Sequence, residues 1–267
     1  MAKGCGFASC KYRLAEVHAL GACHRWLRDL MFAVKFEADG EQTMGHNIQL
    51  NTIDGFKVGA YVAEPQGAAK GAVVVIQEIF GVNQHIREVT DGYAAAGYFA
   101  IAPKIFDRIE PDIELGYEEA DMGKGIELAF QKLDLGTALG DIQSAINTAS
   151  QHGNVGVVGY CFGGLLTWLS ACDLEGVAAA SSYYGGGVAG QMDKTPKCPV
   201  IMHFGEKDAH IPMSDVESVR AAQPDTPVYV YAADHGFNCD HRASYDADAA
   251  SQARTRTLDH FSTHVAS

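Results

Sequence analysis

The chain has 267 residues, with 33 acidic and 20 basic side chains and a formal net charge of −13. Its length suits one large domain or two small ones, and its apolar content of 47% is too high for an intrinsically disordered chain. The acidic balance argues against a nucleic-acid partner because nothing would offset the phosphate charge, and no apolar run of about 18 residues predicts a membrane span.

The charge is divided unevenly along the chain. Residues 1–43 carry six basic and five acidic side chains, a net +1, whereas the remaining 224 residues carry 14 basic and 28 acidic ones, a net −14. Charged residues interrupt the apolar runs of the first segment, so it does not have the pattern of a secretory signal peptide. We expect residues 1–43 to be an N-terminal extension, poorly ordered or not native to the protein, and residues 44–267 to form one domain.

The seven cysteines are odd in number and irregular in spacing. In a chain of this size, that pattern does not indicate a disulfide framework. We therefore expect a reducing compartment and a cytoplasmic location. Separately, we expect the protein to be a monomer or a weak homo-oligomer.

From residue 47 onward, short apolar strands alternate with helices. Residues 48–52 and 57–62 flank the turn signal Asp54-Gly55 and predict an antiparallel hairpin. Further strands are predicted at 72–77, 98–102, 155–159, 177–184, 200–204 and 228–231. Helices are predicted at 83–96, in the second half of 103–133, and at 134–152, 165–171, 214–223 and 244–264.

This alternation predicts the fold class. Strands that alternate with helices form parallel βαβ units, so we expect an α/β fold with a mostly parallel, doubly wound sheet, helices on both faces and a leading antiparallel hairpin. In such sheets the functional side chains lie at the carboxyl ends of the strands.

A nucleophile turn follows the strand at 155–159. The segment Gly159-Tyr160-Cys161-Phe162-Gly163-Gly164 has the pattern G-x-S-x-G with cysteine in the place of serine. Small residues on either side of the nucleophile allow a tight, strained turn, and the N-terminus of the following helix favours a thiolate. The pattern indicates that Cys161 is a catalytic nucleophile.

An acid and a base follow the last two predicted strands, in the order that such a turn predicts. Asp208 could accept a hydrogen bond from one imidazole nitrogen of His235, which would then exchange a proton with Cys161. Glu206 and Asp234 remain alternatives for the acid because they lie close by in the sequence.

A zinc site would be the competing interpretation of the histidine segment. His235, Cys239 and His241 are close in sequence, but their spacing matches no standard zinc-ligand pattern. We therefore expect neither a metal nor an organic cofactor.

With these residues in this order, the chain resembles the dienelactone hydrolase (carboxymethylenebutenolidase) family of α/β-hydrolases over roughly residues 45–265. The most specific match is the segment Gln77-Glu78-Ile79-Phe80-Gly81-Val82-Asn83, directly after the first buried strand, together with residues 159–164. The resemblance implies the α/β-hydrolase fold.

The resemblance also implies roles for residues around the nucleophile. A carboxylate at the position of Glu78 would hold the thiol proton in the resting enzyme and keep Cys161 unreactive until substrate displaces it. A glutamate at the end of an apolar strand would otherwise be costly unless it were paired. The oxyanion hole would consist of the backbone N–H groups of Ile79 and Phe162.

In the family, arginines hold the carboxylate of the lactone. Arg108 matches the first of them, whereas the position of the second, four residues after the catalytic histidine, is occupied by Cys239. Arg242, three positions further on, is the candidate substitute. This departure weakens the case for dienelactone itself as the substrate.

We therefore expect a hydrolase that cleaves a lactone or small ester of the dienelactone (carboxymethylenebutenolide) type through a Cys-His-Asp triad and an acyl-enzyme. Its partner would be that small-molecule substrate. The alternatives are a general carboxylesterase or thioesterase of the same fold, and a non-catalytic member in which the reactive cysteine serves binding or redox sensing.

Overall fold

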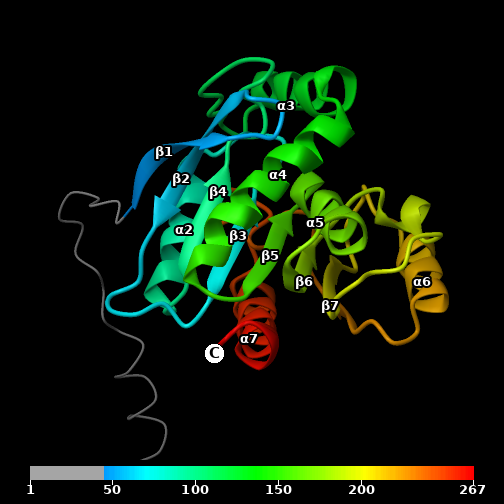
Figure 1. The fold of residues 1–267 in the computed structure, drawn as a ribbon. Coiled ribbons are helices and arrows are strands. Elements are labelled where there is room, and N and C mark those ends of the chain that lie inside the picture. The colour runs from blue at the N-terminus through cyan, green and yellow to red at the C-terminus, as the bar shows by residue number, and fades with distance from the viewer. Residues whose placement is uncertain (1–44) are drawn as a thin grey trace, which may run out of the picture. The chain divides into compact units, whose positions relative to one another are not determined.

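The structure, a computed structural model, describes residues 45–267. Its strands are β1 (Gly45–Asn51), β2 (Lys57–Ala63), β3 (Ala72–Ile76), β4 (Phe99–Pro103), β5 (Val155–Tyr160), β6 (Val177–Tyr183), β7 (Val200–Gly205) and β8 (Val228–Tyr231). They form one sheet with the order β1-β2-β4-β3-β5-β6-β7-β8 (Figure 1). Strands β1, β2 and β4 pair antiparallel and the other neighbours pair parallel. The predicted α/β fold class is confirmed, and the predicted extension, residues 1–43, lies outside the described residues.

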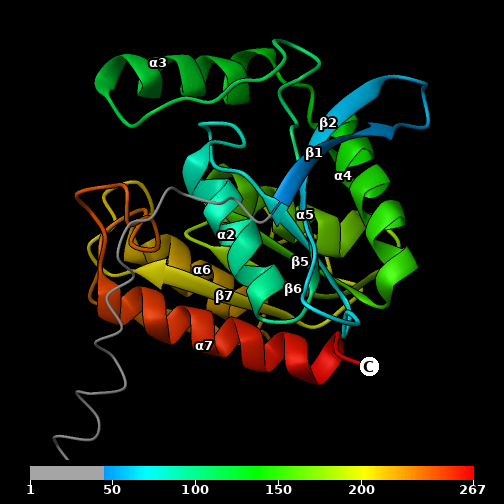
Figure 2. The ribbon, with the colours of Figure 1, turned by 90° about the vertical axis from the view of Figure 1, so that its left-hand side faces the viewer.

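Helices cover both faces of this sheet. The α-helices are α2 (Gln84–Ala95), α3 (Glu119–Glu127), α4 (Leu135–Ala149), α5 (Phe162–Asp173), α6 (Met213–Ala222) and α7 (Ala247–His264). Shorter helical segments are η1 (Leu128–Lys132), η2 (Ser150–His152) and η3 (Val188–Gln191). Helices α4 and α5 pack on one face and α2 and α7 on the other (Figures 1 and 2). Of the helices described, none has the length and apolar character needed to cross a bilayer.

The two helices α2 and α7 are joined by aromatic contacts. The rings of Tyr93 and Phe261 lie 6.1 Å apart, and the guanidinium of Arg254 lies 3.8 Å from the centroid of the Tyr93 ring. Between the helix layers, strands β3 and β4 are buried along their whole length, as their continuous apolar sequences predict.

Helix α5 begins earlier than expected. It starts at Phe162, directly after the nucleophile, rather than at 165. The reason is that Gly164 does not interrupt the helix but allows it to lie close to the sheet, because a Cβ at Gly164 would come within 2.6 Å of the carbonyl oxygen of Tyr183. The hairpin turn is also longer than two residues, since the pairing of β1 with β2 ends at Asn51 and Lys57.

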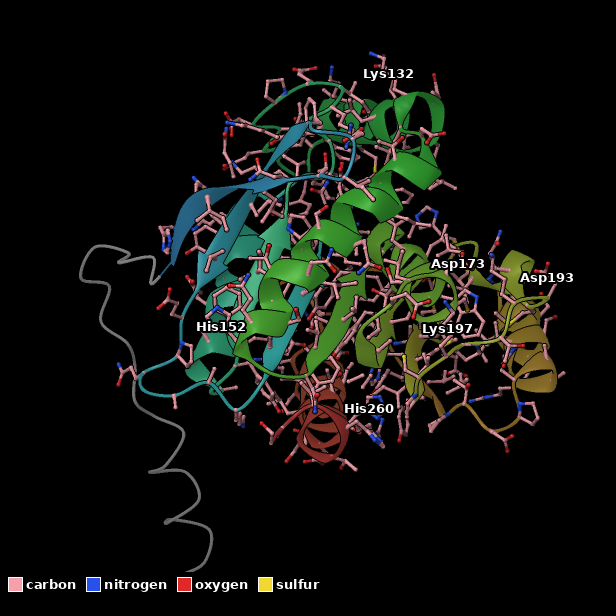
Figure 3. The ribbon with its side chains drawn as sticks, viewed as in Figure 1. Lys132, His152, Asp173, Asp193, Lys197 and His260 are labelled. Atoms are coloured by element: carbon pink, nitrogen blue, oxygen red, sulfur yellow. The ribbon has the colours of Figure 1, made fainter. Side chains whose placement is uncertain are left out.

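Charged side chains on the outer surface point into solvent, as Lys132, Asp173 and Lys197 do in Figure 3. Some form ion pairs, such as Lys194 with Asp173 at 2.9 Å and Lys197 with Glu175 at 2.7 Å. Solvent screens these pairs, so each contributes at most about 1 kcal/mol to stability.

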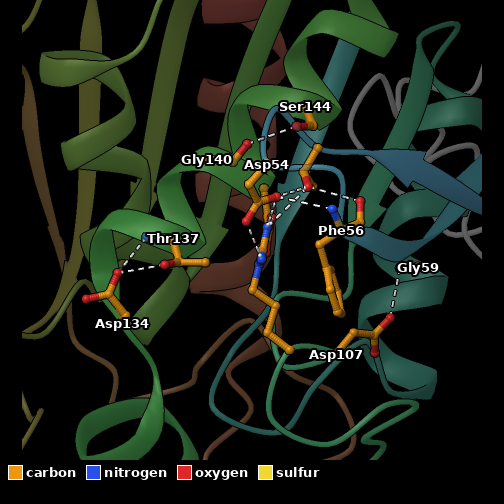
Figure 4. A network of polar contacts seen from close by, with 11 residues as sticks. Asp54, Phe56, Gly59, Asp107, Asp134, Thr137, Gly140 and Ser144 are labelled. Atoms are coloured by element: carbon orange, nitrogen blue, oxygen red, sulfur yellow. Dashed lines mark hydrogen bonds and ion pairs between the residues drawn. The ribbon is translucent and has the colours of Figure 1, made fainter.

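A more buried ion pair ties the β1–β2 hairpin to helix α4. The guanidinium of Arg108 donates to Asp141, whose side chain is fully buried, with Nη2–Oδ1 at 2.7 Å, and to Asp54 of the hairpin turn, with Nη1–Oδ2 at 2.8 Å. It also lies 4.5 Å from the ring centroid of Phe56. Figure 4 shows this network around Asp54 and Phe56, with Ser144 of α4 beside it. Arg108 therefore anchors the edge of the sheet.

Replacing Arg108 by Met tests this anchoring role. The substitution keeps an aliphatic stem but leaves Asp141 as a buried carboxylate without its charged partner. We expect the free energy of unfolding to fall by about 3 kcal/mol, measured by urea denaturation. The matched control is Arg220→Met, because the partner of Arg220, Glu217, is 60% exposed. Equal losses in the two variants would contradict the role.

Candidate active site

Cys161 occupies the tight turn between β5 and α5. Its φ is 56° and its ψ is −116°, a strained conformation for a residue other than glycine. Its backbone N–H donates to the carbonyl oxygen of Tyr183 at 3.0 Å, which holds the turn against β6. The side chain is partly exposed at the N-terminus of α5, where the helix dipole stabilises negative charge.

The glycines around Cys161 are required by close contacts between backbones. A Cβ at Gly159 would collide with the carbonyl oxygen of Gly163, and one at Gly163 would collide with the carbonyl oxygen of Ile76. Strand β5, helix α5 and the end of β3 therefore meet without intervening side chains. This contact explains why the sequence has glycine two residues before and two residues after the nucleophile.

The predicted acid and base are hydrogen-bonded to each other. His235 Nδ1 lies 2.7 Å from Asp208 Oδ2, and both residues are buried. The other oxygen of Asp208 accepts the backbone N–H groups of His210 at 2.8 Å and Ile211 at 3.1 Å, which fixes the orientation of the carboxylate.

The two alternative acids do not occupy this position. Glu206 is exposed, and Asp234 accepts the backbone N–H of His235 at 2.7 Å instead of bonding its ring. The structure thus places Asp208, and neither alternative, at the imidazole.

His235 joins this acid to the nucleophile. Burial lowers the pKa of His235, but hydrogen bonds to Asp208 and Cys161, and the charges of both, outweigh burial and raise the pKa to about 10. The structure therefore brings Cys161, His235 and Asp208 together, with the imidazole between the thiol and the carboxylate.

Glu78 is a fully buried carboxylate beside this group. Neither of its oxygens has a hydrogen-bond partner among the described residues, and its nearest cation is Arg242, with Nη1 at 3.5 Å from Oε1. The Tyr184 hydroxyl is likewise buried without a hydrogen-bond partner in this part of the chain. Burial, followed by the charges of Glu78, Cys239 and Cys161, raises the pKa of Tyr184 well above its usual value. Among the described residues Glu78 is thus held by one long ion pair, and the expected hydrogen bond from the Cys161 thiol to Glu78 is not present in this structure.

A cavity of about 340 Å³ opens above Cys161. Its wall is mainly apolar, and Arg242 is the only arginine or lysine among its lining residues, all of which belong to the described chain. Residues of α3 and η1 cover it from the outside, opposite the strand ends. The lining residues are Ile79, Phe80, Met122, Ile126, Phe130, Cys161, Phe162, Leu165, Gly186, Gly187, His210, His235 and Arg242.

The two arginines predicted to bind a substrate carboxylate have different positions. Arg108 does not line the cavity, and its guanidinium is occupied by Asp141 and Asp54, so that prediction is wrong in this structure. Arg242 does line the cavity, and it lies 5.7 Å from the ring centroid of Phe80. Arg242 is therefore the cation available to a bound anion.

Several residues of the site were not predicted from the sequence. Tyr184 follows β6 directly, and its place at the carboxyl end of a strand could have indicated it. The ring of His210 lies 5.2 Å from that of His235, and its place in the acid loop was a similar signal. Met122 and Phe130, which cover the cavity, lie in a segment without a motif.

The sheet is mostly parallel and carries a strained nucleophile turn. An acid and a histidine follow this turn along the chain and meet at the same edge of the sheet, and together these features define an α/β-hydrolase. Residues 58–265 match the sequence profile described as the dienelactone hydrolase family. The chain therefore belongs to the dienelactone hydrolase family and is an enzyme of the carboxylic-ester hydrolase class.

Individual relatives agree with this assignment. A carboxymethylenebutenolidase of Pseudomonas putida is 34% identical over 222 residues, covering 79% of this chain and 94% of the relative. A Synechocystis protein provisionally named carboxymethylenebutenolidase is 37% identical over 230 residues, covering 78% of this chain and 93% of the relative. A crystallised Klebsiella pneumoniae protein, provisionally assigned as a dienelactone hydrolase, superimposes with a TM-score of 0.71 at 29% identity, covering 82% of this chain and 99% of that one.

Asp208→Asn tests the origin of the raised pKa of His235. The pKa of His235 is about 10 in the folded state and about 6.5, the usual value for histidine, in the unfolded state. The protonated His235 therefore stabilises the folded state fully below pH 6.5, and this contribution is lost as the pH rises from about 6.5 through about 10. Without the carboxylate, the first-ranked cause that raises the pKa of His235 is lost while burial still lowers it, so the pKa should fall and this pH dependence should shrink.

The measurement is urea unfolding on both sides of this pH window, together with an NMR titration of the imidazole. Asp234→Asn is the matched control because Asp234 touches only the backbone of His235. Titration of other groups cancels when the two variants are compared. An unchanged pKa in Asp208→Asn would contradict the assignment.

Proposed function

We propose that the protein hydrolyses a lactone or small carboxylic ester through an acyl-enzyme on Cys161. The observation that carries this proposal is that Cys161 and His235, whose ring is hydrogen-bonded to Asp208, line one mainly apolar cavity. An apolar wall suits the ring or chain of an ester, and a thiolate with an adjacent imidazole suits attack on its carbonyl carbon.

The reaction would have two halves. The Cys161 thiolate adds to the carbonyl carbon, the ring C–O bond breaks, and the leaving oxygen takes a proton from His235. His235 then accepts a proton from water, whose oxygen attacks the thioester, and the free acid and thiolate are released. Both halves pass through a tetrahedral oxyanion.

Two backbone N–H groups are candidates to bind that oxyanion. Phe162 is the first residue of α5, so its N–H has no acceptor within the helix, and Phe162 lines the cavity. Ile79, at the turn after β3, lines the same cavity. Donors of this kind typically accelerate acyl transfer by about 100- to 1,000-fold each.

Glu78 and Arg242 would couple substrate binding to activation of the thiol. The long ion pair between them leaves Arg242 able to turn toward a second anion. A substrate carboxylate that draws Arg242 away would leave Glu78 buried and uncompensated, and such a carboxylate gains affinity for a proton. Glu78 would then take the proton of Cys161, and the thiolate would form only when substrate is present.

This coupling favours an anionic substrate over a neutral ester. The relatives from Pseudomonas putida and Synechocystis carry the name carboxymethylenebutenolidase, the enzyme of a lactone with a carboxylate. We infer a substrate of the same type, a lactone or enol ester with a carboxylate a few ångströms from the scissile carbonyl.

Replacing Cys161 by Ala tests the acyl-enzyme. We expect kcat for the lactone to fall by about 10⁴-fold or more, because the nucleophile is lost. We also expect the wild type, but not the variant, to show the mass of an acyl adduct on rapid quenching. Cys172→Ala is the matched control, since Cys172 is buried in α5 away from the cavity. Full activity in Cys161→Ala would sink the proposal.

Replacing Arg242 by Gln tests the anionic substrate. Loss of a charge-assisted hydrogen bond of about 1.5–3 kcal/mol should raise KM for the carboxylate-bearing lactone by about ten- to 100-fold. The KM for a neutral ester, p-nitrophenyl acetate, should change far less, because that ester has no carboxylate for Arg242 to bind. Arg108→Met, outside the cavity, should leave both KM values unchanged.

A wild type that hydrolyses the lactone no faster than the neutral ester would favour a general esterase instead. A wild type inactive on a broad ester panel would favour a binding protein.

A further inference from the structure

A second group of chemically active side chains lies outside the Cys161 cavity. His85 and Glu88 stand one turn apart on α2, and Asp240 and His241 are neighbours in the loop after β8. Each offers one ligand atom, and these four atoms lie within 4.8 Å of one another. His85, Glu88 and Asp240 line a separate cavity of about 340 Å³ between α2 and α7.

Two of the distances within this group are close to those around one metal ion, and the third is a direct contact that an ion would have to open. His85 Nδ1 is 3.5 Å from Asp240 Oδ1, and His241 Nε2 is 3.8 Å from the same oxygen and 2.6 Å from Glu88 Oε2. Ligands about 2.0–2.2 Å from a tetrahedral zinc ion lie about 3.3 Å from each other. The four atoms could therefore surround an ion with small side-chain adjustments.

The chemistry of the donors selects the class of ion. Two imidazoles and two carboxylates suit Zn²⁺ and neighbouring first-row transition metals, whereas Ca²⁺ and Mg²⁺ prefer oxygen ligands alone. Two carboxylates also neutralise the charge of a divalent ion. A set of four protein ligands leaves no open position and is typical of a structural site.

The burial of His85 is a second, independent observation that points to a bound ion. It is 97% buried, which is costly for an imidazole, and its Nε2 atom has no hydrogen-bond partner among the described residues. A ligand atom of His85 also lies within 4.8 Å of ligand atoms of Glu78 and Cys239, both buried. Histidine ligands usually donate their second N–H to a carboxylate. Glu78 lies close enough to accept it after a small shift, and its oxygens likewise have no hydrogen-bond partner among the described residues.

We propose that His85, Glu88, Asp240 and His241 form a structural binding site for Zn²⁺ or a similar divalent transition-metal ion. The ion would join α2 to the loop after β8, directly before Arg242, and so hold that loop against the helix. This proposal departs from the sequence-based expectation of no metal. That expectation rested on the spacing of His235, Cys239 and His241, of which only His241 belongs to the proposed site, since the His235 ring bonds Asp208. The site does not depend on the proposed hydrolysis.

The test is binding of Co²⁺ to the full-length protein after treatment with a chelator. Co²⁺ held by nitrogen and oxygen ligands gives visible d–d bands without a thiolate-to-cobalt charge-transfer band, which separates this site from one built on cysteines. We expect saturation at one equivalent in the wild type and at least about tenfold weaker binding in His241→Gln and Glu88→Gln. Zn²⁺ should displace Co²⁺ and raise the Tm of the wild type with concentration, but not that of the variants.

The matched control is His264→Gln, which removes an exposed imidazole of α7 whose ring lies 4.9 Å from that of His260. This variant should bind Co²⁺ like the wild type. The proposal is overturned by the absence of a saturable spectrum, by a spectrum that His241→Gln and Glu88→Gln leave unchanged, or by a thiolate charge-transfer band. The four residues would then be an ion-paired cluster only.

Discussion

The site depends on one close approach, that of helix α5 to the ends of β5 and β3. Backbone oxygens of Gly163 and Ile76 occupy the space that a Cβ at Gly159 or Gly163 would need. The turn between β5 and α5 can therefore be tight enough to hold Cys161 at a φ of 56° above the sheet edge. Because the parallel strands all end at this edge, the acid, the base and Glu78 reach Cys161 from strands far apart in sequence.

Two arginines with buried carboxylate partners behave differently because of how many acceptors surround each. Arg108 donates to Asp141 and Asp54, so its charge is compensated twice and it acts as a structural anchor. Within residues 45–267, Arg242 has one carboxylate contact, at 3.5 Å to Glu78, and lines a mainly apolar cavity. An arginine with unused donors in a site of low polarity attracts an anion, whereas a saturated one does not.

The loop after β8 serves two sites from one short segment. His235 faces the nucleophile, Asp240 and His241 face α2, and Arg242 returns to the cavity. Backbone hydrogen bonds within the loop hold these directions, including Cys239 N–H to Gly236 O at 2.9 Å and Arg242 N–H to Cys239 O at 3.1 Å.

The sequence by itself determined the order of strands and helices, the nucleophile turn, and the ends of the strands at which the acid and the base stand. These follow from local patterns, because glycine spacing and apolar runs act over a few residues. Only the tertiary structure decided which acid meets His235 and which arginine reaches the cavity. Arg108 meets carboxylates 33 and 54 residues away. A long, flexible side chain is directed by neighbours that the fold brings to it, and no local pattern records them.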